Sequence, residues 1–395
     1  MLSVEEAIAA VLEDAAPLPA EDVVLTALTG RIVTEEVRAR MTQPPFAASA
    51  MDGYAVRFAD TVESAVLKVI GEAPAGAPFP GKVGAGEAVR IFTGGLIPDG
   101  ADHVVIQEEV ARNGDRIVVS AAQDRPRNIR PAGIDFSEGD TLAEAGTRLH
   151  EVHGALFAAA NIAKVPVRQR PKVAVFSNGD ELVEPGAVLK PGEIFNSNHY
   201  ALCELIRRWG GEAAYLGCAS DDESSIREHF IRARSADIIV PVGGASVGDY
   251  DYVKSAFAEE GGTFRFEKVA VRPGKPTWCG TIGGSRVVGL PGNPASAIVT
   301  AALFVQPLVR RLAGEAWSAT FAKAHLTAPV EANGGRESYL RAIAVGAGGG
   351  YEAAPAPNQD SSLLLPFASA NALIRRPVNA PALSAGAAVE IVWLR

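Results

Sequence analysis

The segment over residues 237–252 places the strongest constraint on the fold. An apolar stretch, Ile238–Val242, leads into paired glycines, then into two acidic residues, Asp249 and Asp251, and then into a helical pattern of apolar residues. A continuous apolar run followed by glycines is typical of a buried parallel strand that ends in a turn before a helix. The segment therefore predicts a strand–turn–helix unit of an open α/β sheet.

Two interpretations of this turn remain open. Glycines let a ligand approach the backbone, the free N–H groups of a helix start suit an anion, and the two carboxylates could hold a metal that bridges to phosphate. An ordinary β–α turn with aspartate caps explains the same residues. The spacing matches neither the dinucleotide-binding glycine motif nor the P-loop, so the common nucleotide motifs do not decide between them.

The composition excludes several classes of protein. A net charge of −9 argues against general binding to nucleic acid or to a membrane surface, so an anionic ligand would need a local basic cluster. The sequence has no uncharged run near the roughly 18 residues of a membrane span and no signal-peptide pattern at its start. Three cysteines without Cys-x-x-Cys spacing indicate a reducing compartment and no zinc site. We therefore expect a cytoplasmic protein.

Changes of pattern along the chain predict four domains. Residues 1–45 and 147–170 form a predicted helical linker domain, with a capping box at Ser3 and Glu6 and helices that include residues 21–40 and 150–164. Residues 46–146 contain short strands between Gly, Pro and Asp turns, which predicts a β-domain inserted into the helical region.

The second half of the chain predicts two further domains. Residues 171–320 alternate strands with helices, which is typical of an open, parallel α/β sheet. Residues 321–395 contain short strands with little helical periodicity, which predicts a small closed or folded-over β-domain.

Polar turns follow three strand ends of the predicted α/β sheet, at residues 177–181, 243–251 and 291–296. Ligands of such sheets bind beyond the carboxyl ends of the strands, so we expect the three turns to line one crevice. The last turn, with Ser296 in the first turn of the following helix, suits an anion. A proline that only starts the helix is the alternative interpretation.

A basic cluster follows in the same domain. Lys268 and Arg272 are four residues apart in a predicted strand over residues 264–271 and beyond, so we expect them to share a face, and Lys275 follows in a rigid turn. Cations close to carboxylates in an acidic protein indicate an anion together with a divalent metal. A solvated surface is the alternative explanation for Lys268 and Arg272.

Seven motifs, in order across nearly the whole chain, resemble those of the molybdopterin molybdenumtransferase family, the MoeA-like proteins that are also similar to the E domain of gephyrin. The motifs lie at residues 49–55 (SAMDGYA), 91–95 (IFTGG), 128–135 (NIR with G-x-D), 177–182 (S-x-GDEL), 243–252 (GG-x-SVG with DY), 273–276 (PGKP) and 289–294 (GLPGNP).

The resemblance implies a reaction, a metal and partners. The family inserts molybdate into adenylylated molybdopterin with release of AMP, so both of these compounds are expected substrates, together with Mg²⁺ or another divalent cation. It implies a homodimer with a shared active site. The adenylyltransferase that supplies the substrate and the molybdoenzymes that accept the product are possible partners.

The resemblance also implies roles for individual residues. The catalytic residues that it implies are Asp52, Thr93, Asp135, Glu181, Asp222 (with Asp221 as the alternative) and Asp251. The metal ligands that it implies are Glu181, Asp222 and Asp251. The pterin and phosphate contacts that it implies are Gly243, Gly244, Ser246, Gly248, Pro291, Gly292, Asn293 and Pro294. The oxyanion contacts that it implies are Lys268, Arg272, Lys275, Ser296, Arg336 and Ser361.

Two positions depart from the family pattern. Ala47 stands where the family often has Asp, so a polar contact is absent there. Arg272 stands where Lys is common, which keeps the charge but replaces a point charge with a planar fork. Two other functions remain as alternatives: the related adenylyltransferase, which resembles the α/β region alone, and a non-enzymatic scaffold.

Overall fold

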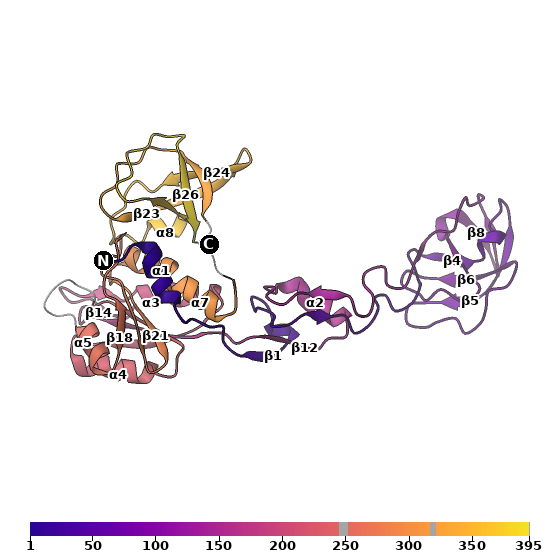
Figure 1. The fold of residues 1–395 in the computed structure, drawn as a ribbon. Helices are drawn as coiled ribbons and strands as arrows, with labels where there is room; N and C mark the ends of the chain where they lie inside the picture. Colours follow the sequence, from indigo (N-terminus) through magenta and orange to yellow (C-terminus); the bar gives the residue numbers. More distant parts are fainter. Residues whose placement is uncertain (245–251, 317–320, 395) are drawn as a thin grey trace. The chain divides into compact units, whose positions relative to one another are not determined.

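The computed structural model describes residues 1–244, 252–316 and 321–394. The chain divides into two compact units, drawn in Figure 1. Unit 1 contains Met1–Glu21, Gly30–Thr34 and Pro166–Arg395, and unit 2 contains Asp22–Thr29 and Glu35–Val165. Each unit has its own apolar cores.

Unit 1 contains the predicted α/β sheet, with six strands. Its order is β16 (Glu212–Ala219), β13 (Lys172–Asn178), β17 (Ile238–Val242), β21 (Ser285–Gly289), β20 (Trp278–Ile282) and β18 (Thr263–Phe266). The first four strands are parallel, β20 pairs antiparallel with β21, and β18 pairs antiparallel with β20. The predicted open α/β architecture is confirmed, with an antiparallel edge added by β20, which the sequence analysis missed.

Helices cover both faces of this sheet, because alternate residues of its central strands point to opposite sides. Val173 and Val175 of β13 pack in one core with α1 (Val4–Leu12) and α3 (Asn198–Arg208). Ala174 and Phe176 pack in the other core with α4 (Glu223–Ala233) and α5 (Tyr252–Glu259). The capping box predicted at Ser3 is present: its hydroxyl accepts from the Glu6 N–H, and the Glu6 carboxylate accepts from the Ser3 N–H.

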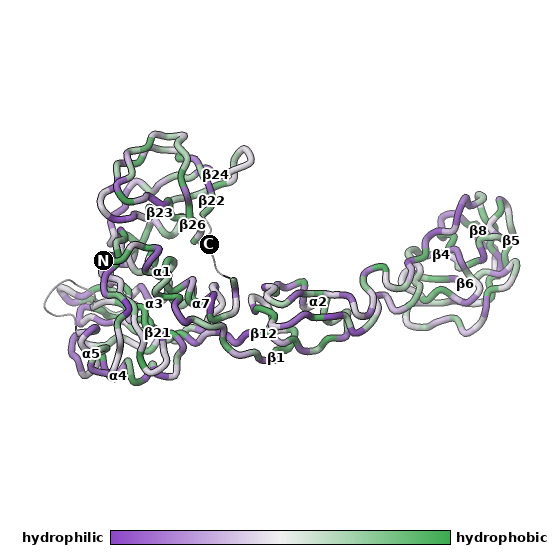
Figure 2. The backbone as a smooth tube through the Cα atoms, in the orientation of Figure 1, coloured by the Kyte–Doolittle hydropathy of each residue, from purple (hydrophilic) through white to green (hydrophobic). Residues whose placement is uncertain are grey.

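The helix predicted to follow the turn at residues 291–296 is present but interrupted. It consists of α6 (Pro294–Thr300), a π turn (Ala301–Val305) and α7 (Gln306–Leu312). Among the described residues, Pro294–Leu312 is the single helix that is long and apolar enough to cross a membrane, but 83% of its most apolar window is buried inside the protein. It is a core helix of unit 1, and its last segment, α7, is labelled in Figure 2, which colours the backbone by hydropathy.

Unit 1 also contains a closed five-stranded barrel. The strands β22 (Ala322–Leu326), β23 (Glu337–Ala347), β24 (Gly350–Pro355), β25 (Ala372–Arg376) and β26 (Ala388–Trp393) pair in a ring, in the order β23-β24-β22-β26-β25 and back to β23. Strand β19 (Val271–Arg272) pairs in parallel with β23, and the short helix α8 (Pro366–Ser369) precedes β25. The predicted small closed β-domain is thus confirmed, and β24 is a strand that the sequence analysis missed.

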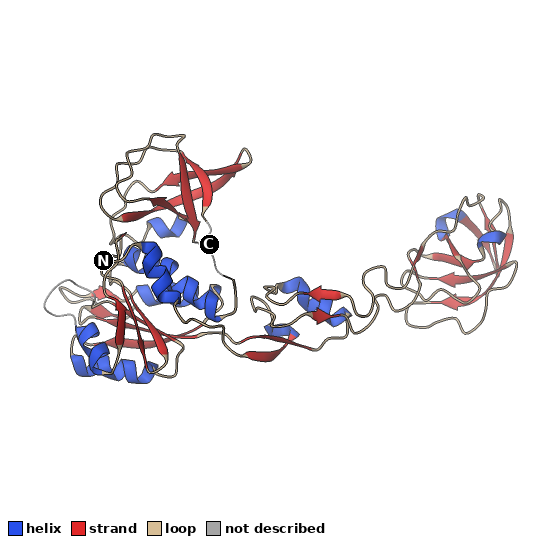
Figure 3. Ribbon diagram, in the orientation of Figure 1, coloured by secondary structure: helices blue, strands red, loops and turns tan. Residues whose placement is uncertain are grey.

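Unit 2 contains a second six-stranded sheet (Figure 3). Its order is β7 (His103–Ile106), β4 (Gly53–Val56), β6 (Glu87–Ile91), β5 (Val66–Ala73), β9 (Arg116–Val119) and β8 (Val110–Asn113). Short two-stranded pairs join β3 (Ala48–Ser49) to β10 (Ile129–Arg130) and β2 (Val37–Arg38) to β11 (Thr141–Ala143). The chain also contains α2 (Glu151–Ala159) and the short 3-10 turns Leu25–Ala27, Phe58–Asp60 and Gln107–Glu109. In unit 1, β14 (Leu182–Val183) pairs in parallel with β15 (Ile194–Phe195).

Two predictions of secondary structure are wrong. Residues 21–40 form no α-helix: β1 (Ala20–Val24) pairs with β12 (Lys164–Arg168), because β-branched residues such as Val23 and Val165 suit a strand better than a helix. The strand predicted over residues 264–271 is split between β18 and β19, which belong to different sheets. The boundaries of the four predicted domains stay a prediction.

Candidate functional site

Two adjoining cavities lie in unit 1, one where the parallel strands β13, β17 and β21 end and the other between β19, α6 and the barrel. The first, here called the strand-end cavity, has a volume of about 530 Å³, and the second, the barrel-side cavity, has a volume of about 750 Å³. Both are lined by Pro276 and Ser296, so they share one wall. The expectation that polar turns at strand ends meet in one place is confirmed for residues of all three turns, among them Ser177, Gly243 and Asn293.

Most of the predicted contact residues line these cavities. The predicted residues of the strand-end cavity are Glu181, Gly243, Gly244, Pro291, Gly292, Asn293, Pro294 and Ser296. The predicted residues of the barrel-side cavity are Arg272, Lys275, Ser296, Arg336 and Ser361. Ser246, Gly248, Asp249 and Asp251 lie outside the described residues. Lys268 lines neither cavity among the described residues, because it lies between β18 and β19 and not on a strand shared with Arg272.

The glycines after β17 are required by close contacts. Gly243 has φ of +107°, and a Cβ atom there would lie 2.4 Å from the Asn178 carbonyl oxygen. A Cβ atom on Gly244 would lie 2.3 Å from a methyl group of Val253. Any other residue would force the turn away from the end of β13, so these glycines allow the floor of the strand-end cavity to form.

The acidic residues around the strand-end cavity have different surroundings. Glu181 is exposed and lines the cavity, and none of its carboxylate oxygens accepts a hydrogen bond from the described part of the chain. Asp221 accepts from Asn178 Nδ2 at 2.9 Å, which ties the turns after β16 and β13 together. Asp222 Oδ1 accepts from Ser224 Oγ at 2.5 Å and from the Ser225 N–H at 2.8 Å, so it caps α4. Both hydrogen bonds lower the pKa of Asp222, and the one from the Ser224 hydroxyl has the larger effect.

These residues fit a divalent cation only in part. No group of three His, Cys, Asp or Glu side chains within the described ranges could hold a metal. Mg²⁺ usually takes one or two carboxylates and completes its shell with water and substrate phosphates. Glu181 offers such a hard oxygen ligand beside a cavity with polar lining. The oxygen ligands that the protein offers would therefore bind Mg²⁺ only together with further oxygen ligands from a phosphate-bearing substrate.

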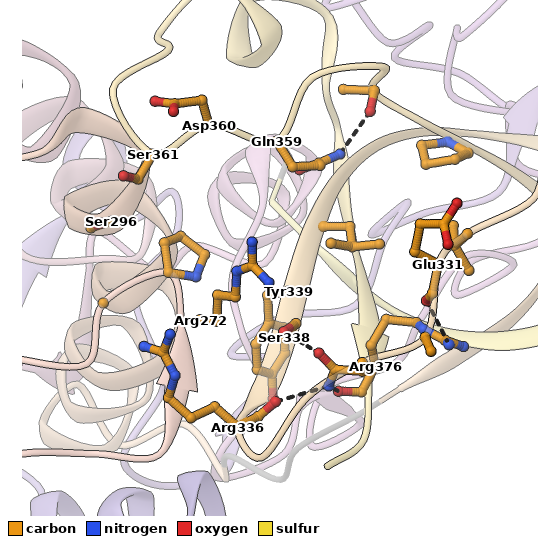
Figure 4. Close-up of a pocket in the computed structure, with 18 of the residues that line it drawn as sticks. Arg272, Ser296, Glu331, Arg336, Ser338, Tyr339, Gln359, Asp360, Ser361 and Arg376 are labelled. Carbon is orange, nitrogen blue, oxygen red and sulfur yellow. Dashed lines mark hydrogen bonds between the residues drawn. The ribbon is translucent and has the colours of Figure 1, made fainter. Parts of the chain in front are cut away.

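The barrel-side cavity is basic and polar (Figure 4). Arg272 in β19 and Arg336, the residue just before β23, both line it although they are far apart in the sequence, because β19 pairs with the start of β23, with Arg272 opposite Ser338. Arg336 is half-buried and its Nη1 donates to the Val271 carbonyl at 3.3 Å, which holds its guanidinium beside β19. With Lys275, these cations outnumber the acidic lining residues Glu331 and Asp360, so the cavity suits an anion.

A loop of the barrel closes this cavity against α6. The Ala295 N–H donates to the Ser361 carbonyl at 3.1 Å, and Asn293 Nδ2 donates to Ser361 Oγ at 3.0 Å. Ser296 and Ser361, from distant parts of the chain, therefore both line the cavity (Figure 4). Hydroxyl donors beside guanidinium groups form a set that can surround a tetrahedral oxyanion.

Several lining residues were missed by the sequence analysis. Asn178 and Asn198 line the strand-end cavity, and Asn198 Nδ2 donates to the Gly292 carbonyl at 2.7 Å. Gln359, Asp360 and the buried Arg376 line the barrel-side cavity. Asn178 directly follows an apolar run, which is a signal that could have found it. The three barrel residues carry no such local signal.

The remaining predicted residues belong to unit 2. Asp52 Oδ1 accepts from the Thr93 N–H at 2.7 Å and from Thr93 Oγ1 at 2.8 Å, so the two predicted motifs meet. Both hydrogen bonds lower the pKa of Asp52, and the one from the Thr93 backbone N–H has the larger effect. Asp135 is exposed, and within the described ranges no hydrogen bond joins its side chain to Asp52 or Thr93. Their catalytic roles stay predictions.

Comparison with known proteins covers the whole chain. Models of three domains match: the MoeA N-terminal region (domains I and II) at residues 2–161, a domain described as "probable molybdopterin binding domain" at residues 174–311, and the MoeA C-terminal region (domain IV) at residues 323–394. The resemblance inferred from the seven motifs is thereby confirmed.

Individual relatives agree with these domains. A molybdopterin molybdenumtransferase of Nostoc is 36% identical over 95% of this chain and 88% of its own length, and that of Haemophilus influenzae is 39% identical over 80% and 78%. The crystal structure of the molybdopterin biosynthesis MoeA protein from Pyrococcus horikoshii is 34% identical, with a TM-score of 0.82 over 100% of this chain and 99% of that one. The chain therefore belongs to the molybdopterin molybdenumtransferase family.

Proposed function

We propose that this chain inserts molybdenum from molybdate into adenylylated molybdopterin and releases AMP, the last step in making the molybdenum cofactor. The observation that carries the proposal is the pair of adjoining cavities. One has glycine turns and the carboxylate of Glu181, which accepts no hydrogen bond from the described part of the chain and suits a divalent cation with a phosphate-bearing substrate. The other has cations and serine residues, which suit an oxyanion. The shared wall at Ser296 would bring the two substrates together.

The side chains have distinct tasks in this reaction. Arg272 and Arg336 would bind molybdate by paired N–H donors, and Lys275 would add a point charge. Ser296 and Ser361 would donate hydroxyl hydrogen bonds to the same anion. Glu181 would hold Mg²⁺ together with the substrate phosphates, and Asp222 and Asp251 remain further proposed ligands. When bound, Mg²⁺ supplies a Lewis acid that polarises the phosphoryl bond to AMP.

The experiment mixes the purified protein with adenylylated molybdopterin, Mg²⁺ and molybdate. We expect release of AMP, measured by chromatography, and a product that restores activity to a molybdenum-free molybdoenzyme. Glu181→Gln should abolish AMP release, because it removes the proposed metal ligand and keeps the side-chain size. Glu193→Gln is the matched control, since Glu193 is in the same region and does not line either cavity.

The same assay separates the alternatives. A protein that releases pyrophosphate from ATP and molybdopterin would be an adenylyltransferase. A protein that releases neither AMP nor pyrophosphate would be a scaffold, and either result would overturn the proposal.

We also propose that the protein is a homodimer with a shared active site, which acts in the cytoplasm. The family resemblance supports the dimer, and the three cysteines, all free, support a reducing compartment. Light scattering should give twice the chain mass of 41.2 kDa. A monomer at assay concentration that is fully active would contradict the shared site. The adenylyltransferase and the acceptor molybdoenzymes remain proposed partners.

A further inference from the structure

Arg341 is a buried cation of the barrel that lines neither cavity. It lies in β23 with a relative exposure of 2%. Its Nη1 donates to the Asp360 carbonyl at 2.9 Å and its Nη2 to the Asn358 carbonyl at 3.4 Å. Its guanidinium carbon lies 5.6 Å from the centre of the Phe367 ring. All of these partners belong to one connection, residues 356–371 between β24 and β25, so the guanidinium acts on this loop alone.

Gln359, in the same loop, also forms hydrogen bonds with Arg341 of β23. Its Oε1 accepts from the Arg341 N–H at 3.0 Å and from Arg341 Nε at 3.1 Å, and its Nε2 donates to the Arg341 carbonyl at 3.0 Å. The amide therefore pairs both main-chain groups of Arg341. Residues 358–363 are held on the barrel by side-chain contacts that converge on a single residue.

The other side of this loop contacts α6. Ser361 accepts from the Ala295 N–H through its carbonyl and from Asn293 Nδ2 through its hydroxyl, as described above. Between the two attachments, Gln359, Asp360 and Ser361 line the barrel-side cavity. Arg341 thus contacts the loop that forms this cavity wall, although it does not line the cavity itself.

We infer that Arg341 is a positioning residue that holds residues 358–363 as the wall of the oxyanion cavity. This inference rests on the proposed function, because it assumes that the barrel-side cavity binds molybdate. A buried guanidinium is costly unless its donors are paired. The planar fork of Arg reaches several carbonyl oxygens at once, whereas the single ammonium of Lys does not. An Arg at this position therefore fixes the loop in one conformation.

The test compares Arg341→Lys with the wild-type full chain. Molybdate affinity is measured by calorimetry, and exchange of backbone amides is measured for residues 358–363 and for the Ala295 N–H. We expect the Kd for molybdate to rise about tenfold, the effect of losing one hydrogen bond from the displaced loop, such as that of Ser361, to a charged ligand. We also expect faster exchange at both places, which a purely local change in the barrel would not produce at Ala295.

Arg375→Lys is the matched control. Arg375 lies in the same barrel, and its guanidinium donates to Glu337 and Glu390, neither of which is in the loop. We expect wild-type affinity and wild-type exchange at Ala295 in this variant. If Arg341→Lys does not fold, Phe367→Leu, which removes only the ring beside the guanidinium, should still increase exchange at residues 358–363.

The outcomes separate the inference from the proposed function. Equal exchange at Ala295 in wild type and Arg341→Lys would overturn the positioning role, whatever the affinity. A wild-type protein that does not bind molybdate would contradict the proposed function, while the exchange measurement would still decide whether Arg341 holds the loop.

Discussion

At the scale of single residues, His199 shows how burial sets a charge state. Its ring stacks on Tyr215 with centroids 3.8 Å apart and also contacts Tyr200. Burial lowers the pKa of His199, and the nearby carboxylate of Glu184 raises it by a smaller amount. Its Nδ1 is buried without a hydrogen-bond partner in the described structure. The folded protein therefore favours the neutral imidazole.

The buried environment of His199 predicts that the stability of the protein depends on pH. In the unfolded chain, His199 takes up a proton near the ordinary histidine pKa, whereas in the folded chain it does so only at lower pH. At pH values below 6.5 the unfolded state therefore binds more protons than the folded state. The contribution of His199 to the free energy of unfolding is fully present above pH 6.5 and is lost as the pH falls from there towards the pKa of the folded protein.

We expect the melting temperature of wild type to fall more between pH 7 and pH 5 than that of His199→Phe, which keeps an aromatic ring against Tyr215 and cannot be protonated. The measurement is thermal unfolding followed by circular dichroism across roughly this range. Parallel pH profiles for the two proteins would show that His199 does not titrate in this way.

At the scale of elements, Asp222, a predicted metal ligand in the turn before α4, has a structural role. Asp222 caps the helix through Oδ1, and Asp221 instead links the neighbouring turns. A cap satisfies an N–H group that has no partner within the helix, so it fixes where the helix begins. The metal role of Asp222 stays a prediction, and substitution can separate the two tasks.

We expect Asp222→Asn to melt at the wild-type temperature, since Asn caps a helix as well as Asp does, and Asp222→Ala to melt lower. Thermal unfolding of both variants checks this. AMP release by the Asn variant at the wild-type rate would assign Asp222 to the cap alone, and its loss would support the metal role. An Ala variant that melts like wild type would contradict the importance of the cap.

At the scale of the whole molecule, the two units have separate cores. The clusters around the α/β sheet and inside the barrel belong to unit 1, and those around β4 and β6 belong to unit 2. Separate cores allow a chain to unfold in more than one step. Every residue that lines the two cavities belongs to unit 1.

We therefore expect calorimetry to resolve more than one unfolding transition. Added molybdate should raise the temperature of only one of them, because a ligand stabilises the part of the native structure that binds it. A single transition, or an equal shift of all transitions, would show that the units unfold together.

The sequence by itself determined the local features of this protein. It predicted the strands that end in polar turns, the glycines after β17, the capping box at Ser3 and the motifs of the family, because each depends on residues close together in the chain. The same local patterns misplaced residues 21–40 in a helix, since only pairing with the distant β12 shows that β1 is a strand.

Only the tertiary structure decided which residues surround the oxyanion cavity. Pairing of β19 with β23 brings Arg272 and Arg336 together and leaves Lys268 out, and no spacing in the sequence encodes that pairing. The same holds for Arg341, which an isolated β-strand pattern would place among ordinary barrel residues. Contacts between distant segments depend on how whole elements pack, so they follow from the complete fold and not from the short-range patterns that predict each element.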